Sequence, residues 1–207
     1  KDAAAHAGKL VMQLLAAGTS ARAFITRASL ENAITAVAAT GGSTNAVLHL
    51  LAIAREAGVP LDIDDFDKLA ARTPTIADLK PGGRFTAVDL HHAGGLAVLC
   101  QRLFLAGLLH DTPTVSGQSL RAEADAARET AGQEVITSLE KPKAATGGLA
   151  ILRGNLAPDG CVIKLSGHSR TRHVGPARVF DSEEAAFAAV QAGAIKAGDV
   201  VVIRFEG

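Results

Sequence analysis

The residues best suited to hold a charged ligand follow a glycine pair, Gly41 and Gly42, and are Ser43, Thr44 and Asn45. The glycines allow the backbone to turn tightly or to approach a ligand without a Cβ in the way. Ser, Thr and Asn are all good helix N-caps, and an apolar helical pattern follows them. The first N–H groups of such a helix lack partners within it and carry the positive end of its dipole, so they can bind a carboxylate or a phosphate. On these grounds alone an ordinary capped helix start is the commoner interpretation, because Gly-Gly-Ser-Thr also occurs in turns that bind nothing.

A second group of chemically active residues is the acidic stretch 62–67, which holds four carboxylates. A calcium-binding EF-hand needs a glycine at its turn and a glutamate at its far end, and both are missing here. We expect instead that Asp64 or Asp65 caps a short helix that contains Phe66 and Leu69.

The histidines and cysteines predict no metal site by their spacing. His49 falls inside an apolar helical pattern and is expected to be buried with one satisfied hydrogen bond. His91 and His92 are adjacent, so they point in different directions and only one is expected to face a site. Cys100 and Cys161 fit neither a disulfide framework nor a CxxC pair, which indicates a reduced, cytosolic setting, and each is expected to be a small buried residue.

The composition predicts a globular chain and disfavours nucleic acid and membranes as partners. The 207 residues have a mass of 21.1 kDa, and 48% hydrophobic content is enough for a core. Lys and Arg number 21, as do Asp and Glu, and Tyr and Trp are absent, so neither a basic surface nor aromatic platforms indicate nucleic acid. No apolar segment approaches the ~20 residues of a membrane span, and no signal peptide precedes the first helical pattern, so no membrane partner is expected.

The elements that must position the glycine turn are predicted to be helices in the first part of the chain. Helices are expected over about residues 2–17, 27–39, 45–57 and 95–106. Gly18, Gly58 and Gly107 supply stop signals. The segment Lys80–Arg84 reads as a turn with two cations, for which a surface loop is favoured over an anion contact.

The second part of the chain is predicted to be rich in strands. The stretch 141–148, which ends in two glycines, is predicted to be a linker. Short β-type runs follow at 149–153, 161–165, 177–180 and 200–204. One helix interrupts them at 182–192, with Ser182 as its cap. This pattern predicts an α/β chain with a helix-rich domain over 1–143 and a β-rich domain over 144–207. The chain also opens inside a helix and ends after a strand, so both ends are expected to be cuts from a longer protein.

Five segments resemble, in the same order, the dihydroxy-acid dehydratase / 6-phosphogluconate dehydratase family. They are Gly41–Leu50, Asp78–Arg84, Asp89–Gly95, Gly154–Gly160 and Gly198–Gly207. The resemblance implies that 1–143 is the C-terminal part of the family's N-terminal α/β domain. It implies that 144–207 begins a β-rich, swivelling β/α domain.

The family's chemistry is the dehydration of 2,3-dihydroxy carboxylates to 2-keto acids, a hydro-lyase reaction. The resemblance implies an iron–sulfur cluster that binds the leaving hydroxyl, a Mg²⁺ ion that holds the substrate and a serine base. The family's positions for these ligands and for the base precede Lys1 or follow Gly207, so no catalytic or metal residue is assigned here. Cys161 stands where some members carry a cysteine that is not a ligand. A cytoplasmic homo-oligomer, dimer or tetramer, is also implied.

What the chain retains is the expected substrate contact at Ser43, Thr44 and Asn45. The segment Pro158–Lys164 resembles dihydroxy-acid and some sugar-acid members more than 6-phosphogluconate dehydratases. The favoured substrates are 2,3-dihydroxyisovalerate and 2,3-dihydroxy-3-methylvalerate of valine and isoleucine biosynthesis. A sugar-acid dehydratase, acting on pentonate, hexonate or 6-phosphogluconate, is the alternative. A different class also stays open, in which the chain is a non-catalytic scaffold fragment whose uncovered apolar helices associate.

Overall fold

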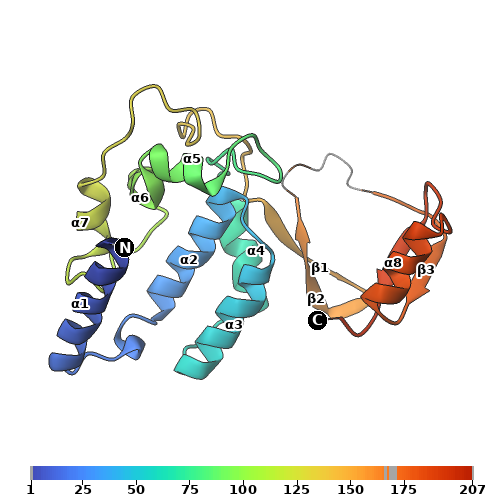
Figure 1. Ribbon diagram of the computed structural model, residues 1–207, viewed down its shortest axis with the longest axis horizontal. Coiled ribbons are helices and arrows are strands. Elements are labelled where there is room, and N and C mark those ends of the chain that lie inside the picture. Colours follow the sequence, from blue (N-terminus) through green and yellow to red (C-terminus); the bar gives the residue numbers. More distant parts are fainter. Residues whose placement is uncertain (1, 166, 168–171, 207) are drawn as a thin grey trace. The chain divides into compact units, whose positions relative to one another are not determined.

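The computed structural model describes residues 2–165, 167 and 172–206, and the chain divides into two compact units, Lys1–His168 and Ser169–Gly207 (Figure 1). Among the described residues, the first unit is built mainly of helices and carries one β-hairpin, and the second holds two strands and a helix. The mixed α/β class with a helix-rich N-terminal part is therefore confirmed. The predicted domain boundary between residues 143 and 144 stays a prediction, and the division into compact units falls 25 residues later, after His168.

Helices make up most of the first unit. They are α1 (Asp2–Ala16), the 3₁₀ helix η1 (Ala21–Ala23), α2 (Arg27–Thr40), α3 (Asn45–Ala57), α4 (Ile63–Arg72), α5 (Ala87–His92), α6 (Gly95–Leu105) and α7 (Leu120–Asp125). Gly18, Gly58 and Gly107 adopt φ values of 67°, 72° and 67°, so the predicted glycine stops are confirmed.

Helix α2 is central to the first unit because both hydrophobic clusters include its residues. Ile34 and Ala38 pack with α3, α4 and strand β1, and Ala39 packs with α5, α6 and the segment around Ile136. α2, α3 and α4 lie side by side (Figure 1). The start of α2 is fixed by a capping box between Thr26 and Ser29. Its end therefore lies at a defined position between the two clusters, where the Gly41–Gly42 turn begins.

A β-hairpin covers α4 in the first unit. Strands β1 (Leu149–Gly154) and β2 (Ala157–Lys164) are antiparallel, and the Ile151 N–H donates to Asp67 Oδ1 at 3.1 Å. Because side chains alternate along a strand, Ile151 and its partner Val162 face the core, while the next pair faces outward.

The second unit pairs β3 (Ala177–Phe180) with β4 (Val200–Ile203) in parallel, and α8 (Glu183–Gln191) connects them. Ser182 caps α8 by accepting from the Ala185 N–H, as predicted. Arg178 Nε binds Asp199 Oδ2 at 3.0 Å beside the pair of strands.

Several predictions about burial are wrong. The apolar pattern over 45–57 does not make α3 a buried helix: Val47 and Ala54 are its buried residues and Leu48 is 63% exposed, because α2 and α4 cover one side of it. His49 is exposed for the same reason. Cys161 is exposed because it belongs, with Leu152, to the outward-facing pair of the hairpin.

The cap of α4 also differs from the prediction. Asp62, whose backbone is extended, accepts from the Asp64 N–H at 2.9 Å. Asp65 occupies the third helical position and accepts from the Asp62 N–H at 2.8 Å, which completes a capping box. The acidic stretch therefore serves to begin a helix, and its N-cap, Asp62, lies two residues before Asp64 and three before Asp65.

Candidate functional site

The turn between α2 and α3 depends on its two glycines. Gly41 has φ of 57°, and the Gly42 N–H donates to the Val37 carbonyl at 2.9 Å. A Cβ on Gly42 would lie 3.1 Å from Val37 Cγ1 and 3.3 Å from the Val37 carbonyl oxygen. The pair of glycines thus lets the chain reverse tightly and presents the next residues at the start of α3.

The hydroxyl residues after the glycines differ in their hydrogen bonds. Ser43 Oγ accepts from the Asn45 N–H at 3.2 Å. Thr44 stands at the N-cap position with helical φ and ψ of −61° and −22°, and its side chain makes no capping bond. Of the three cap-type residues, Thr44 takes the N-cap position without a side-chain bond, so its hydroxyl is not committed to the helix start.

A cavity of about 360 Å³ opens at this turn. Its lining comes from three segments far apart in the sequence, namely Thr40–Thr44, Leu79–Pro81 and Lys164. We call it the anion cavity, since it combines the ammonium groups of Lys80 and Lys164 with the hydroxyls of Ser43 and Thr44. The structure brings Ser43 and Thr44 into this cavity, whereas Asn45 lies outside its lining.

Lys164 reaches the turn because of the register of the hairpin. It pairs with the buried Leu149, so it shares the inward face with Val162. Its Nζ donates to the Gly42 carbonyl at 3.2 Å. Sequence reasoning missed Lys164 as a site residue, and the available signal was its period-2 spacing from Val162 at the end of a predicted strand.

Lys80 lies on the loop Lys80–Arg84, which is exposed as predicted and also supplies one wall of the anion cavity. A carboxylate or phosphate held there would meet two cations, two hydroxyls and the N-terminus of a 13-residue helix. The cavity is therefore chemically suited to a small organic anion.

A smaller cavity of about 120 Å³ adjoins the anion cavity and shares Thr40 and Leu79 with it. Asp78, which is 2% exposed, lies in its lining. Arg84 Nε is 2.6 Å from Asp78 Oδ2, and Lys143 Nζ is 3.1 Å from Asp78 Oδ1. Burial alone would raise the pKa of Asp78, but the hydrogen bonds from Arg84 and Lys143 outweigh it, so the pKa lies below its usual value.

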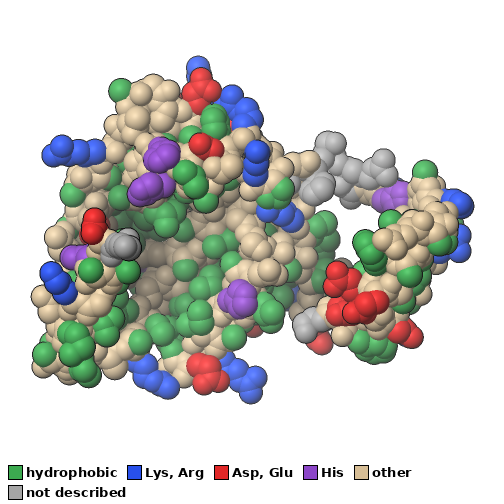
Figure 2. Space-filling view, viewed as in Figure 1, with side chains coloured by type: hydrophobic (Ala, Val, Ile, Leu, Met, Phe, Trp, Pro, Cys, Tyr) green, Lys and Arg blue, Asp and Glu red, His purple; other side chains and the backbone are tan. Residues whose placement is uncertain are grey.

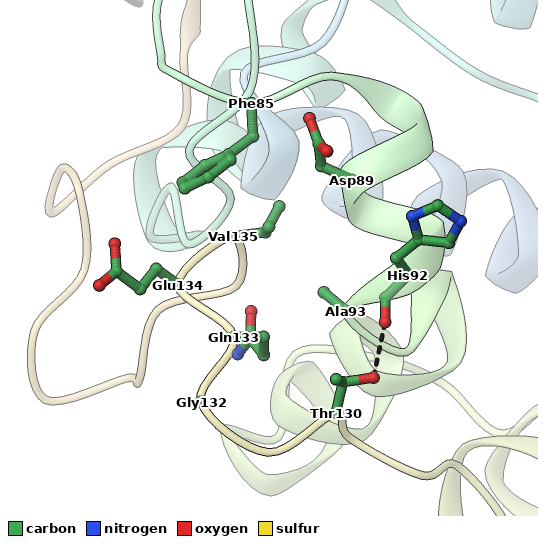
Figure 3. Close-up of a pocket in the computed structure, with 9 residues that line it drawn as sticks. All are labelled: Phe85, Asp89, His92, Ala93, Thr130, Gly132, Gln133, Glu134 and Val135. Carbon is green, nitrogen blue, oxygen red and sulfur yellow. Dashed lines mark hydrogen bonds between the residues drawn. The ribbon is translucent and has the colours of Figure 1, made fainter.

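A third hollow, of about 370 Å³, lies between α5 and the segment 130–135 and shares no lining residue with the anion cavity (Figure 3). Asp89 there is committed to capping α5, because its Oδ2 accepts from the N–H and hydroxyl of Thr86, and these bonds lower its pKa. The Thr130 hydroxyl donates to the His92 carbonyl at 2.6 Å. His92 lines this hollow and His91 does not; that one of the two histidines serves a site stays a prediction.

The described residues hold no group of three or more His, Cys, Asp or Glu side chains arranged to bind a metal ion. Cys100 is partly buried, and burial raises the pKa of its thiol, which disfavours the thiolate that would bind a metal. In the same part of the chain no helix is both long and apolar enough to cross a bilayer.

Comparison with known proteins gives two family models. The model described as dihydroxy-acid/6-phosphogluconate dehydratase N-terminal matches residues 1–123, and the corresponding C-terminal model matches 134–207. The anion cavity takes lining residues from both matched ranges.

Curated relatives match the whole chain. A dihydroxy-acid dehydratase of Koribacter versatilis is 56% identical over 208 residues, which cover 100% of this chain and 36% of the relative. A dihydroxy-acid dehydratase of Roseiflexus castenholzii is 56% identical over 209 residues, covering 100% and 37%. One of Thermus thermophilus is 53% identical over 204 residues, covering 98% and 37%. The chain thus spans little more than a third of the length of these relatives.

Proposed function

Because the chain belongs to the dihydroxy-acid/6-phosphogluconate dehydratase family, we propose that it forms part of a hydro-lyase that converts 2,3-dihydroxy carboxylic acids to 2-keto acids. The observation that carries this proposal is the 56% identity, over the whole chain, to relatives named dihydroxy-acid dehydratase. Those names favour a dihydroxy acid over the sugar acids. The proposed substrates are 2,3-dihydroxyisovalerate and 2,3-dihydroxy-3-methylvalerate of valine and isoleucine biosynthesis.

The proposed task of this chain is to hold the carboxylate of the substrate. Lys80 and Lys164 supply positive charge, and the hydroxyls of Ser43 and Thr44 supply hydrogen bonds. Thr44 suits this role because no capping bond occupies its hydroxyl. Asn45 is retained as a proposed contact through the exposed side of the first turn of α3.

The iron–sulfur cluster and Mg²⁺ implied by the resemblance do not fit the described residues. These residues offer no metal-binding group of three side chains, and of the two cysteines one is partly buried with a raised pKa and the other is exposed on β2. No step assigned to this chain therefore passes through either group. Both cofactors, the homo-oligomeric state and the cytoplasmic location remain proposals for the protein that contains the chain.

The binding role is tested by titrating the ¹⁵N-labelled chain with 2,3-dihydroxyisovalerate and recording amide chemical shifts. We expect shifts at residues 43–47, because their N–H groups lie nearest the bound carboxylate. The carboxamide analogue of the ligand, which lacks the charge, should leave these amides unchanged. Equal shifts with the carboxamide analogue, or no shifts at this turn with either ligand, would contradict the proposal.

Variants identify the groups that bind. Lys164→Met removes a charged donor worth roughly 1.5–3 kcal/mol, so affinity should fall about tenfold or more. Thr44→Ala should weaken binding about fivefold, since a neutral hydrogen bond contributes roughly 1 kcal/mol. Lys9→Met, on the exposed side of α1, is the matched control and should bind like the wild type.

The substrate is tested in the complete enzyme that contains this chain. Side-by-side values of kcat/KM on 2,3-dihydroxyisovalerate, a pentonate and 6-phosphogluconate should be highest for the first. Thr44→Ala or Asn45→Ala should raise KM or lower turnover there. A higher kcat/KM on a sugar acid would support the alternative dehydratase, and unchanged kinetics with unchanged stability would leave the chain as a non-catalytic scaffold.

A further inference from the structure

We propose that Asp78 is a positioning residue that fixes the loop Lys80–Arg84 so that Lys80 faces the anion cavity. This inference rests on the proposed carboxylate-binding role of that cavity. It assigns a function to a buried carboxylate that lies outside the lining of the anion cavity and so acts through the loop.

Two ion pairs connect Asp78 to the last residue of the loop and to a distant segment of the chain. Arg84, at the end of the loop, binds one carboxylate oxygen at 2.6 Å, and Lys143, 65 residues away in sequence, binds the other at 3.1 Å. The side chains of the two cations are 61% and 44% exposed, whereas that of Asp78 is 1% exposed. The carboxylate is therefore the fixed member of the cluster, and the cations close over it.

The backbone of the loop folds tightly onto the same residue. The Lys80 N–H donates to the Phe85 carbonyl at 2.7 Å, and the Phe85 N–H donates to the Asp78 carbonyl at 3.0 Å. A Cβ on Gly83 would lie 2.5 Å from Asp78 Oδ1 and 2.6 Å from the Asp78 carbonyl oxygen. Only glycine fits there without a shift of the backbone, so the path of the loop is set by contact with Asp78.

The position of Asp78 is in turn set by the core. Its N–H donates to the Val135 carbonyl at 2.9 Å, and the preceding residues Ile76 and Ala77 are buried in the cluster of α5 and α6. The core segment thus holds Asp78 in place, and Asp78 in turn holds the exposed loop. Without its charge, Arg84 and Lys143 lose their common partner, and the loop keeps its backbone bonds and the exposed ion pair between Arg84 and Glu134 at 3.2 Å.

The first test measures the loop without ligand. Amide hydrogen exchange of Lys80 and Gly83 should become at least tenfold faster in Asp78→Asn than in the wild type. Asp125→Asn, an exposed charge on α7, is the control and should leave both rates unchanged. Because a buried substitution can unfold the chain, Arg84→Gln is the second variant, and its exposed side chain should give the same local acceleration without a global one. Unchanged exchange of Lys80 in both variants would overturn the inference, whatever the cavity binds.

The second test is a double-mutant cycle read by the affinity for 2,3-dihydroxyisovalerate. Lys80→Met should weaken binding about tenfold in the wild type and less than threefold in Asp78→Asn, because the lysine is no longer held at the cavity. Lys164→Met should cost the same factor in both backgrounds, since Lys164 is placed by the hairpin. If Asp78 only stabilised the fold, Asp78→Asn would alter the affinity losses caused by Lys80→Met and by Lys164→Met by the same factor, or would alter neither.

The outcomes separate this inference from the proposed function. Equal losses for Lys80→Met in both backgrounds would overturn the positioning role while leaving the anion cavity as the binding site. No loss for Lys80→Met in the wild type would also overturn it, and Lys164→Met would then decide whether the cavity binds carboxylates at all.

Discussion

Arg27 joins the starts of two helices through side-chain contacts. Its Nε binds Glu31 Oε1 one turn along α2 at 2.7 Å, and its Nη1 binds Asp65 Oδ2 of α4 at 2.8 Å. The same Asp65 oxygen accepts from the Asp62 N–H in the capping box. A single carboxylate therefore serves both the start of α4 and its attachment to α2.

We predict that Asp65 makes stability depend on acidity. The hydrogen bond from Arg27 lowers the pKa of Asp65, and burial opposes this shift without cancelling it. A carboxyl whose pKa is lower in the folded state stabilises the fold above its unfolded pKa of about 3.9, and this stabilisation disappears as pH falls through the folded pKa. Asp65→Asn should therefore cost about 1 kcal/mol at pH 7, because Arg27 is partly solvated, and little once the pH lies below the folded pKa of Asp65.

Urea unfolding at a series of pH values measures this effect. Asp159→Asn, an exposed carboxylate on β2, is the control and should leave the free energy of unfolding within about 0.5 kcal/mol at each pH. A deficit of Asp65→Asn that stays constant down to acid pH would show that the charge of Asp65 is not responsible.

At the scale of elements, the hairpin depends on one point of close contact. Gly147 is buried where the chain passes α2 and α4, and its N–H donates to the Ala70 carbonyl at 2.8 Å. A Cβ there would lie 2.7 Å from Ala38 Cβ and 3.1 Å from Ala70 Cα. These neighbours belong to helices and cannot move independently.

We predict that Gly147→Ala destabilises the first unit by about 1–3 kcal/mol, the usual cost of overpacking a core. Gly154→Ala, at the end of β1 where a Cβ meets open space, is the matched control and should change stability little. Thermal unfolding followed by circular dichroism gives both values. Because Lys164 belongs to this hairpin, Gly147→Ala should also weaken carboxylate binding at the anion cavity, and a variant of unchanged stability would contradict the packing account.

The ends of elements were predictable from the sequence because their causes are local. Gly58 and Gly107 end helices through a left-handed backbone, and Ser182 begins one through its hydroxyl. Burial was less predictable, since it depends on distant segments. His49 and Cys161 are exposed because no other element covers their faces of α3 and β2. The spacing of residues within α3 or β2 cannot predict which face is covered.

The candidate site shows the same division. Ser43 and Thr44 could be predicted as site residues because the signals that mark the start of a helix lie in adjacent residues. Lys164 was missed because its contact with Gly42 spans 122 residues. Asp78 begins a segment that resembles the family, yet its role depends on Lys143, which is 65 residues away and belongs to no predicted helix or strand.

At the scale of the whole molecule, each compact unit leaves apolar side chains uncovered. In the second unit Phe187 and Val190 of α8 are exposed, and Ala186 is the buried hydrophobic residue among those described. In the first unit no residue of α1 is buried, and apolar side chains gather over this helix (Figure 2, lower left). Contiguous exposed apolar surface of this kind is typical of interaction sites.

We predict that α1 makes the chain self-associate. Val11 and Leu15 lie one turn apart and are 62% and 68% exposed, so apolar burial of about 1.5–3 kcal/mol per side chain is gained when two such helices meet. Light scattering coupled to sizing chromatography should give a mass that rises with concentration above the 21.1 kDa of one chain.

The double variant Val11→Lys with Leu15→Lys should keep the mass of a single chain at every concentration. It should leave the free energy of unfolding unchanged, because neither side chain is buried within the chain. His6→Lys with Gln13→Lys adds the same charge on the polar side of α1 and should not reduce association. A wild-type chain that stays at 21.1 kDa throughout the series would contradict the prediction and leave α1 an exposed helix without self-affinity.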